Sequence, residues 1–410
     1  MFKTICTLTV ISALSASVGF ATHAADWPRF RGPDANGESP EKGINKDWKS
    51  KPPKELWKIS MTDNGFAGPA IAAGKVFIID HSGGEDIIRA IDFKTGKEAW
   101  RFAYADASKD NYGFSRSTPA FDSGKLYTVS REGHVNCLDA EKGTKIWTRD
   151  MRGEFQGQTG GWDYAGSPLV DGEKVIVCPG GQKGVVALDK NTGKEIWSGG
   201  GPDLAGYSTP VIGTINGKKQ CIIFEGKALI GIDPDKGGAP LWRCPWPTAY
   251  DVNAANPIVV DDSSIFVTSG YGVGCGLIKV QGATAQPVWK TKEIKAHFST
   301  PVLVDGHIYG IGDGFGLACV DPKTGNATWK HAETDRGNGW DKAGLVIVDG
   351  VLLAVNGADG DVFMVEAKPD AYHELGRFKP LGDQSWTAPA VSDGKLIIRN
   401  KTTLGCFDLK

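Results

Sequence analysis

Aromatic and charged side chains recur in this chain just before short apolar strands that begin with a small residue and a proline. Aromatic rings offer stacking surfaces, and Arg, Asp and His side chains supply the few polar contacts that orient a ligand. We therefore expect these positions to converge on a stacking pocket with polar groups. The candidate ligand-binding residues are Phe66, Arg116, Trp162, Asp163, Tyr207, Asp251, His297, Phe298, Trp340, Asp341 and Trp386. The alternative is that about half of these aromatics pack between repeated units of the fold.

Some of the same residues have the chemistry to hold a cation or a charged cofactor. Arg116 with Asp163, Asp251 and Asp341 would suit a carboxylate-rich cofactor or a cation. Calcium, however, takes about six or more oxygen ligands, and no such cluster is visible in the sequence. Solvated loop charges are the favoured interpretation, and a single histidine such as His297 is more often a hydrogen-bonding group than a base. Since the sequence has neither a nucleophile motif nor Cys-x-x-Cys, no catalytic residue and no metal ligand is predicted.

A repeat supplies the elements that must position these residues. Each unit runs through three apolar strands with hairpin turns such as Asp393-Gly-Lys395, then an Asp-x-x-Thr-Gly turn and a strand closed by Trp. The units start 42 to 50 residues apart, at Pro69, Pro119, Pro168, Pro210, Pro257, Pro301, Leu345 and Pro389. The closing tryptophans are Trp100, Trp147, Trp197, Trp242, Trp289 and Trp329, with Phe378 in the weakest unit. This period is typical of four-stranded propeller blades.

The last unit is cut short at the C-terminus. Its three strands lie within residues 387–409, and the missing strand with its Trp is found at the other end, in Lys54-Glu-Leu-Trp57-Lys-Ile59. A strand that completes the last unit would close a ring and remove the open sheet edges. The prediction is an all-β, eight-bladed β-propeller over residues 53–410.

The residues before the propeller are of two kinds. Residues 1–25 have Lys3, an apolar stretch and small residues around Ala24 and Ala25, which is typical of a cleaved signal peptide. We therefore expect an exported protein, periplasmic or secreted, with no membrane span. Residues 26–52 are predicted to form an irregular arm, whose Trp27 and Phe30 pack on the main body.

The net charge and the positions of the cysteines limit the kinds of partner and the disulfide bonds that we expect. The formal net charge of −2 and the lack of a basic run give no reason to expect a nucleic-acid partner. Cys137, Cys319 and Cys406 occupy equivalent positions of different repeats, which would not bring their Cα atoms within disulfide range. We expect seven free thiols beyond the signal segment, and a monomer.

The repeat resembles the tryptophan-docking motif of the PQQ-type, quinoprotein alcohol dehydrogenase-like β-propellers. The resemblance rests on Ala90-Ile-Asp-Phe-Lys-Thr-Gly-Lys-Glu-Ala-Trp100, Ala187–Trp197 and Cys319–Trp329. It implies that each closing tryptophan, Trp57 included, packs between neighbouring blades, with a small residue opposite it. The chain also resembles short exported bacterial proteins of this type and the outer-membrane protein assembly propellers.

Three functions follow from the resemblance. The leading hypothesis is a non-catalytic propeller, without a predicted cofactor, that binds a ligand or a protein partner at its channel mouth. The second is a PQQ-dependent alcohol or sugar dehydrogenase with the quinone and calcium on the propeller axis. The adjacent-cysteine disulfide typical of those enzymes is missing from the sequence, which counts against this reading. The third is a scaffold for envelope protein assembly.

Overall fold

The computed structural model describes residues 26–312, 316–332, 340, 342 and 344–410. The predicted signal segment 1–25 and Asp341 lie outside the described residues. The remainder is almost entirely β structure, with two short 3₁₀ turns, η1 (Gly181–Lys183) and η2 (Ala249–Asp251). No helix among the described residues is long and apolar enough to cross a bilayer.

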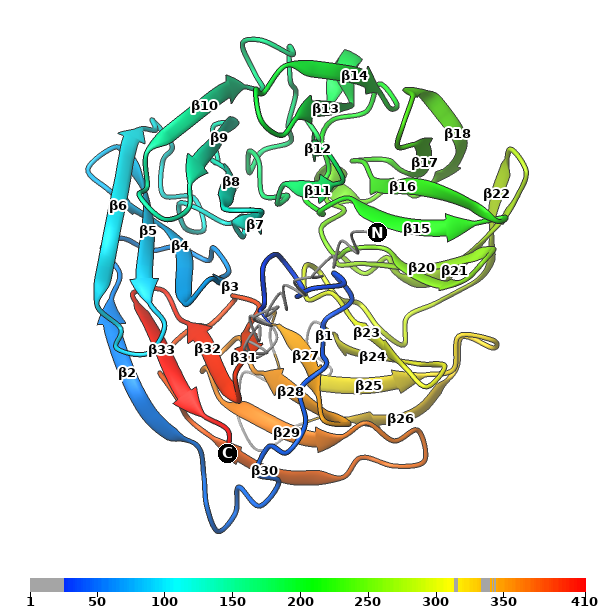
Figure 1. Cartoon of the computed structure of the whole chain (residues 1–410). Coiled ribbons are helices and arrows are strands. Elements are labelled where there is room, and N and C mark those ends of the chain that lie inside the picture. Colours follow the sequence, from blue (N-terminus) through cyan, green and yellow to red (C-terminus); the bar gives the residue numbers. More distant parts are fainter. Residues whose placement is uncertain (1–25, 313–315, 333–339, 341, 343) are drawn as a thin grey trace, which may run out of the picture.

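The strands form four-stranded antiparallel units, called blades below, arranged around a central axis (Figure 1). The first blades in chain order are β3 (Ala70–Ala72), β4 (Lys75–Ser82), β5 (Glu85–Asp92), β6 (Glu98–Ala105); β7 (Ala120–Asp122), β8 (Lys125–Val129), β9 (His134–Asp139), β10 (Lys145–Asp150); β11 (Leu169–Asp171), β12 (Lys174–Val177), β13 (Val185–Asp189), β14 (Glu195–Gly199); and β15 (Val211–Ile215), β16 (Lys218–Phe224), β17 (Ala228–Asp233), β18 (Gly237–Pro245). The later ones are β19 (Ile258–Asp261), β20 (Ser264–Ser269), β21 (Gly274–Gln281), β22 (Thr284–Thr291); β23 (Val302–Val304), β24 (His307–Gly312), β25 (Gly316–Val320), β26 (Ala327–His331); β27 (Leu345–Val348), β28 (Val351–Val355), β29 (Val362–Glu366), β30 (Glu374–Phe378); and β31 (Ala390–Ser392), β32 (Lys395–Arg399), β33 (Thr403–Asp408) with β2 (Lys54–Ser60).

Turn chemistry explains why these segments form hairpins. In the turn between β23 and β24, Asp305 and Gly306 both have positive φ (47° and 77°), as a two-residue hairpin requires. In the Asp-x-x-Thr-Gly turn after β5, Oδ1 of Asp92 accepts hydrogen bonds from the backbone N–H of Thr95 at 2.8 Å and from its hydroxyl at 2.7 Å. Gly96 follows with φ 70°, a conformation that favours glycine.

The glycine of this turn also makes room for a tryptophan from another blade. A Cβ on Gly96 would lie 2.8 Å from the Trp57 ring, and a Cβ on Gly143 would lie 2.5 Å from Trp100. The indole Nε1 donates to a carbonyl of the blade on which the ring docks, at 3.0 Å from Trp57 to Phe93 and 3.1 Å from Trp100 to Ala140. The same bond is made by Trp147, Trp197, Trp289 and Trp329 at 2.9–3.1 Å. The expected docking between blades is therefore confirmed at these six tryptophans.

Trp242 behaves differently. Its Nε1 donates to Oε1 of Gln220, in its own blade, at 2.7 Å. The following blade has no Asp-x-x-Thr-Gly turn, because β21 and β22 are joined at Gly282 by a shorter hairpin. The Trp242 ring is still buried in a cluster with Ile265 and Val280 of the following blade, so it differs from the other six tryptophans in its hydrogen bond.

The two ends of the described chain meet in one blade. β2 pairs antiparallel with β33, with Trp57 opposite Cys406, as the sequence predicted. Small residues also face Trp100 (Ala90) and Trp147 (Cys137) across their strand pairs. Each pairing has a register shift beside the tryptophan, which turns the indole toward the neighbouring blade. All seven cysteines among the described residues are free, in agreement with the expectation from their positions.

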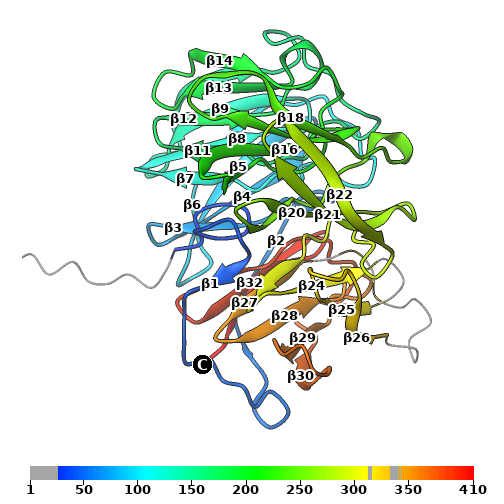
Figure 2. The same cartoon turned by 90° about the vertical axis from the view of Figure 1, so that its right-hand side faces the viewer.

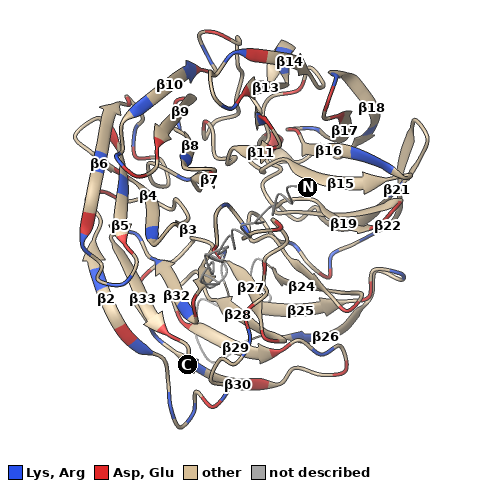
Figure 3. Ribbon diagram, in the orientation of Figure 1, with Lys and Arg blue, Asp and Glu red and all other residues tan. Residues whose placement is uncertain are grey.

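The arm of residues 26–52 crosses one face of the disc, at the left in Figure 2. Trp27, which is only 2% exposed, exchanges two backbone hydrogen bonds of 2.8 Å with Ile71, and the short strand β1 (Glu38–Ser39) pairs in parallel with β27. Trp48, not singled out in the sequence, is equally buried and packs edge-on against Phe378. The prediction that Trp27 packs on the main body is confirmed. Charged residues gather on the outer strands and turns, while the inner strands are mostly uncharged (Figure 3).

Candidate functional site

A cavity of about 560 Å³ lies on the axis, between the inner strands and the segments that precede them. Its volume is within the range of small-molecule sites. Its wall includes a set of large rings, a set of small and hydroxyl-bearing residues and part of the arm. Among the predicted residues, those that line it are Phe66, Arg116, Trp162, Tyr207, His297, Phe298 and Trp386.

The rings form a nearly continuous series of contacts around the cavity entrance, here called the aromatic collar. Its members are Phe66, Tyr112, Trp162, Tyr250, Tyr271, His297, Phe298 and Trp386. Neighbouring centroids lie 4.8–6.4 Å apart, from Trp162 to Tyr250, Tyr271, His297, Phe298 and Trp386, and from Trp386 to both Phe66 and Tyr112. Most of these contacts are edge-to-face or tilted, as aromatic quadrupoles prefer.

Backbone conformations place several collar rings at the rim. Tyr112, Tyr250 and Tyr271 have positive φ (62°, 61° and 53°), which is uncommon for bulky residues. The Tyr112 and Tyr250 rings are 64% and 71% exposed, so burial does not account for these conformations. Strained backbone of this kind clusters at functional sites. The collar is therefore a stronger candidate site than a set of interblade packing residues.

Arg116 links the two collar residues Tyr112 and Trp162 through their backbone carbonyls. Its guanidinium donates to the Trp162 carbonyl, to the Asn111 carbonyl at 2.5 Å and to the Tyr112 carbonyl at 3.4 Å, so it ties two loops together. Burial lowers the pKa of Arg116 to about 10, which leaves it charged at neutral pH. No carboxylate pairs directly with it among the described residues.

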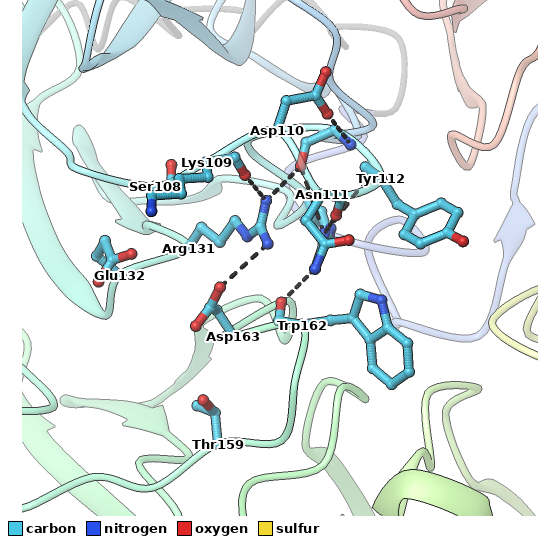
Figure 4. Close-up of polar contacts among 12 residues, drawn as sticks. Ser108, Lys109, Asp110, Asn111, Tyr112, Arg131, Glu132, Thr159, Trp162 and Asp163 are labelled. Carbon is cyan, nitrogen blue, oxygen red and sulfur yellow. Dashed lines mark hydrogen bonds and ion pairs between the residues drawn. The ribbon is translucent and has the colours of Figure 1, made fainter.

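Asp163 faces away from the cavity. Its carboxylate pairs with Arg131 at 3.2 Å and with Arg152 at 2.6 Å, and Arg131 also donates to the Gly113 carbonyl at 2.8 Å. Figure 4 shows Arg131 between Lys109 and Asp163, with the Trp162 and Tyr112 rings to one side of this network. Asp163 therefore supports the loop that carries Trp162, in contrast to the direct ligand contact that we predicted.

Three other predicted residues are not in the described cavity wall. Trp340 is 1% exposed and packs against Phe363 in the core between blades, with ring centroids 4.4 Å apart and the planes tilted by 37°. Asp251 has positive φ (57°) and its carboxylate lies 3.9 Å from the Lys227 ammonium, outside the cavity. Asp341 lies outside the described residues.

Sequence reasoning missed a ring of polar side chains deeper in the cavity. Its five members, here called the hydroxyl belt, each precede the proline that opens a blade: Thr118, Ser167, Thr209, Asn256 and Thr300. The backbone N–H of each donates to the side-chain oxygen of the next: Thr118 to Ser167, Ser167 to Thr209, Thr209 to Asn256 and Asn256 to Thr300, all at 2.9–3.0 Å. The hydroxyl or amide before each proline was the signal that could have revealed it.

The belt is incomplete on the other side of the axis. The equivalent positions there are Gly344, Ala388 and Gly68, which have no polar side chain. A Cβ on Gly68 would lie 2.3 Å from the Thr118 hydroxyl, and a Cβ on Gly344 would lie 2.2 Å from Cδ of Pro389. The cavity thus has a polar half and an apolar half.

The arm contributes Phe30 and Arg31 to the cavity wall. Arg31 is 6% exposed and donates to the carbonyls of Thr300 at 2.9 Å and Pro301 at 2.8 Å, just before β23, whereas Trp27 is bonded to Ile71 of β3. Burial lowers its pKa to about 9. Because the arm crosses the face opposite the collar, the cavity opens through the collar.

The fold and the motif together define a propeller built from PQQ-like repeats. A family model described as outer membrane protein assembly factor BamB matches residues 84–331 and 235–410. The chain belongs to this family of PQQ-like repeat β-propellers, which is related both to quinoprotein alcohol dehydrogenases and to BamB.

Individual relatives fall into the same two groups. The chain is 25% identical over 379 residues to the quinoprotein ethanol dehydrogenase of Pseudomonas aeruginosa, a match that covers 86% of this chain and 52% of the relative. It is 24% identical over 318 residues to the outer membrane protein assembly factor BamB of Yersinia pestis, covering 73% and 75%. The chain spans about half the length of the quinoprotein dehydrogenases that it matches.

Solved structures show the same fold at low sequence identity. BamB from Moraxella catarrhalis superposes with a TM-score of 0.62 at 16% identity, over 87% of this chain and 98% of that one. Quinohemoprotein alcohol dehydrogenase from Comamonas testosteroni superposes with a TM-score of 0.66 at 16% identity, over 93% and 80%.

Proposed function

We propose that this protein is an exported, non-catalytic propeller that binds a small ligand inside the aromatic collar. The observation that carries the proposal is the collar itself, a series of partly exposed rings around a cavity that the arm closes at its other end. Exposed rings on strained loops have no packing role, whereas they suit a ligand that stacks.

The proposed architecture is an eight-bladed ring over residues 53–410, with residues 26–52 as an arm and 1–25 as a cleaved signal. The pairing of β2 with β33 and the docking of Trp57 on the β3–β6 blade support closure of the ring. A closed ring leaves only the short inner strands as sheet edges and holds the collar residues in fixed positions.

The described cavity does not fit PQQ held with calcium. The charged residues of its described wall are Arg31, Arg116 and Lys342, and Asp and Glu are absent from it. In the described ranges, no three His, Cys, Asp or Glu side chains are grouped to hold a metal ion. The carboxylates of Asp163 and Asp251, considered above as candidates for holding a cation, lie next to Arg131, Arg152 and Lys227. Among the described residues, the cavity wall therefore offers no carboxylate to calcium.

Native mass spectrometry of protein purified without denaturation tests the binding proposal. We expect a bound small molecule that is retained by Trp386→Phe and lost from Trp386→Ala, because the ring is what stacks. Equal retention by both variants would contradict the proposal. Dye-linked alcohol oxidation after incubation with PQQ and calcium would contradict its non-catalytic part.

A protein partner is the second candidate. The outer strands carry aliphatic side chains that are 41–58% exposed, namely Leu56, Ile146, Ile196, Leu241 and Val288. A row of such residues suits an interaction surface, as an envelope assembly scaffold would need. Cross-linked pull-down from envelope extract tests it: a partner captured by the wild type and lost from Ile146→Asp with Ile196→Asp supports a scaffold, and capture that is unchanged contradicts it.

A further inference from the structure

We propose that the ligand of this cavity is the terminal unit of an acidic saccharide, a sugar chain that carries carboxylates. This inference rests on the proposed function, because it names the chemistry of what the collar binds. It follows from the hydroxyl belt, the apolar half of the cavity, the uncompensated arginines and the closed end.

The belt presents hydrogen-bond donors to the cavity. The oxygens of Ser167, Thr209 and Thr300 already accept a backbone N–H, so each hydroxyl hydrogen remains to be donated. Asn256 accepts the Thr209 backbone N–H through Oδ1, so the N–H groups of its side-chain amide likewise remain to be donated. These donors have no acceptor among the described residues, so a ligand rich in oxygen acceptors would satisfy them.

The opposite half of the cavity suits the face of a sugar ring. Phe66, Phe298 and Trp386 lie beside the small residues Gly344 and Ala388 there. The C–H groups on one face of a pyranose are weakly positive and stack on the negative face of an aromatic ring. A sugar has an apolar face and polar edges, and this matches a cavity with one apolar and one polar half.

Charge favours an acidic sugar over a neutral one. Arg31 and Arg116 both line the cavity and bond only to backbone carbonyls among the described residues. No described carboxylate lines the cavity to balance them. The buried guanidinium of Arg31 and the half-buried one of Arg116 have no carboxylate paired directly with them among the described residues, so they raise the potential inside the cavity and favour an anion.

The closed end favours a chain terminus. Phe30 and Arg31 of the arm line the cavity, and Arg31 is held there by the Thr300 and Pro301 carbonyls, so the arm obstructs the passage of a polymer along the axis. A ligand that enters through the collar must stop at the belt. The last unit of a chain fits this geometry, and an internal unit does not.

Calorimetric titration with three probes tests the proposal: trigalacturonate, its carboxyl-reduced neutral counterpart, and PQQ without calcium. We expect trigalacturonate to bind about tenfold or more tightly than the neutral trisaccharide, which corresponds to ~1.4 kcal/mol. Equal affinity for the two saccharides would overturn the acidic part of the proposal. Binding of PQQ without binding of either saccharide would overturn the sugar, yet leave the ligand-binding function standing.

Asn256→Asp is the sharpest variant. Its carboxylate still accepts the N–H of Thr209, so the bond between blades is retained, while a donor becomes an anionic acceptor. Because the site is only 3% exposed, a melting curve must show that the variant remains folded at the temperature of the titration. We expect trigalacturonate affinity to fall about tenfold or more in this variant. Unchanged affinity would overturn the role of the belt.

Two arginine variants distinguish a direct contact in the cavity from an effect of the overall charge of the protein. Arg116→Gln is expected to lower the affinity for trigalacturonate about tenfold and to leave the affinity for the neutral trisaccharide nearly unchanged. Arg101→Gln, on the outer strand β6 with a side chain 60% exposed, removes the same charge far from the collar and should change neither. Equal weakening by both variants would overturn the proposed contact. Failure of both saccharides in the wild type would overturn the saccharide proposal. The proposed function would fail as well only if native mass spectrometry also finds no co-purified molecule that Trp386→Ala loses.

Discussion

The indole Nε1 of Trp57 donates a hydrogen bond of 3.0 Å to the carbonyl oxygen of Phe93, although Trp57 belongs to the blade that ends the chain. β2 carries Trp57 into that last blade, and Phe93 lies in the turn of the first blade after the arm. One side chain therefore joins the last blade to the first, and the positions of the collar residues depend on this joint.

Replacement of Trp57 by Ala is expected to destabilise the protein by about 3–5 kcal/mol, since it leaves a large cavity between two blades. Deletion of Lys54–Ile59 should lower the melting temperature further, because Thr403–Asp408 would lose its partner strand. Leu56→Ala, next to Trp57 but 46% exposed, is the matched control with little effect. Equal melting temperatures for Trp57→Ala and Leu56→Ala would show that the ring is not closed here.

Arg31→Ala should loosen the arm. The substitution removes the donors to the carbonyls of Thr300 and Pro301, which are then buried without a hydrogen bond. Each unsatisfied carbonyl is expected to cost about 1–3 kcal/mol of folding free energy. Hydrogen exchange of residues 26–40 should become faster while β12 and β13 are unchanged. Lys42→Ala, an exposed position of the same arm, should leave exchange as in the wild type. Unchanged, slow exchange of the arm in Arg31→Ala would contradict the role of Arg31 in holding the arm on the propeller.

Glu225 is expected to make stability depend on pH. It is 2% exposed, accepts the Gly201 N–H at 2.8 Å, and burial raises its pKa to about 7. The folded state holds this proton more tightly than the unfolded state, so its contribution is complete below pH ~4.5 and is lost as the pH rises to about 7. In Glu225→Gln the melting temperature should fall less between pH 5 and 8. Burial also raises the pKa of Asp86 to about 7, so the melting temperature of Glu225→Gln should still fall to some extent as the pH rises. Identical slopes in wild type and Glu225→Gln would contradict the assignment.

All seven cysteines of residues 26–410 should react with a thiol reagent in denaturant without reductant. In the native protein the reaction should be slow, because the thiols are largely buried and burial raises the pKa of Cys137 and Cys406 to about 12. Fewer than seven titrated thiols would indicate disulfides that the structure does not have.

Repeated features were predictable from the sequence, and features that depend on one loop were not. The docking of Trp57 and Trp100 follows from a motif that recurs in most blades, so each copy supports the others. Trp340 and Trp386 occur in similar contexts before a strand, yet one stacks on Phe363 in the core and the other lines the cavity. Local φ values and neighbouring blades decide between the two directions.

The direction in which charged side chains point could not be predicted from the sequence either. Asp163 has a φ of 59°, and its carboxylate faces arginines from other loops that no local pattern reveals. The belt was missed because Thr and Ser before proline look like ordinary strand starts. Their role becomes visible only when neighbouring blades bring Thr118 and Ser167 within hydrogen-bonding distance.

A crystal structure of the protein with trigalacturonate, at a concentration that saturates binding, tests the central claim most directly. We expect density for the terminal sugar inside the collar, with its ring against Trp386 and its oxygens within hydrogen-bonding distance of Asn256 and Thr209. Density for the saccharide elsewhere on the surface, with the cavity filled by water alone, would contradict it.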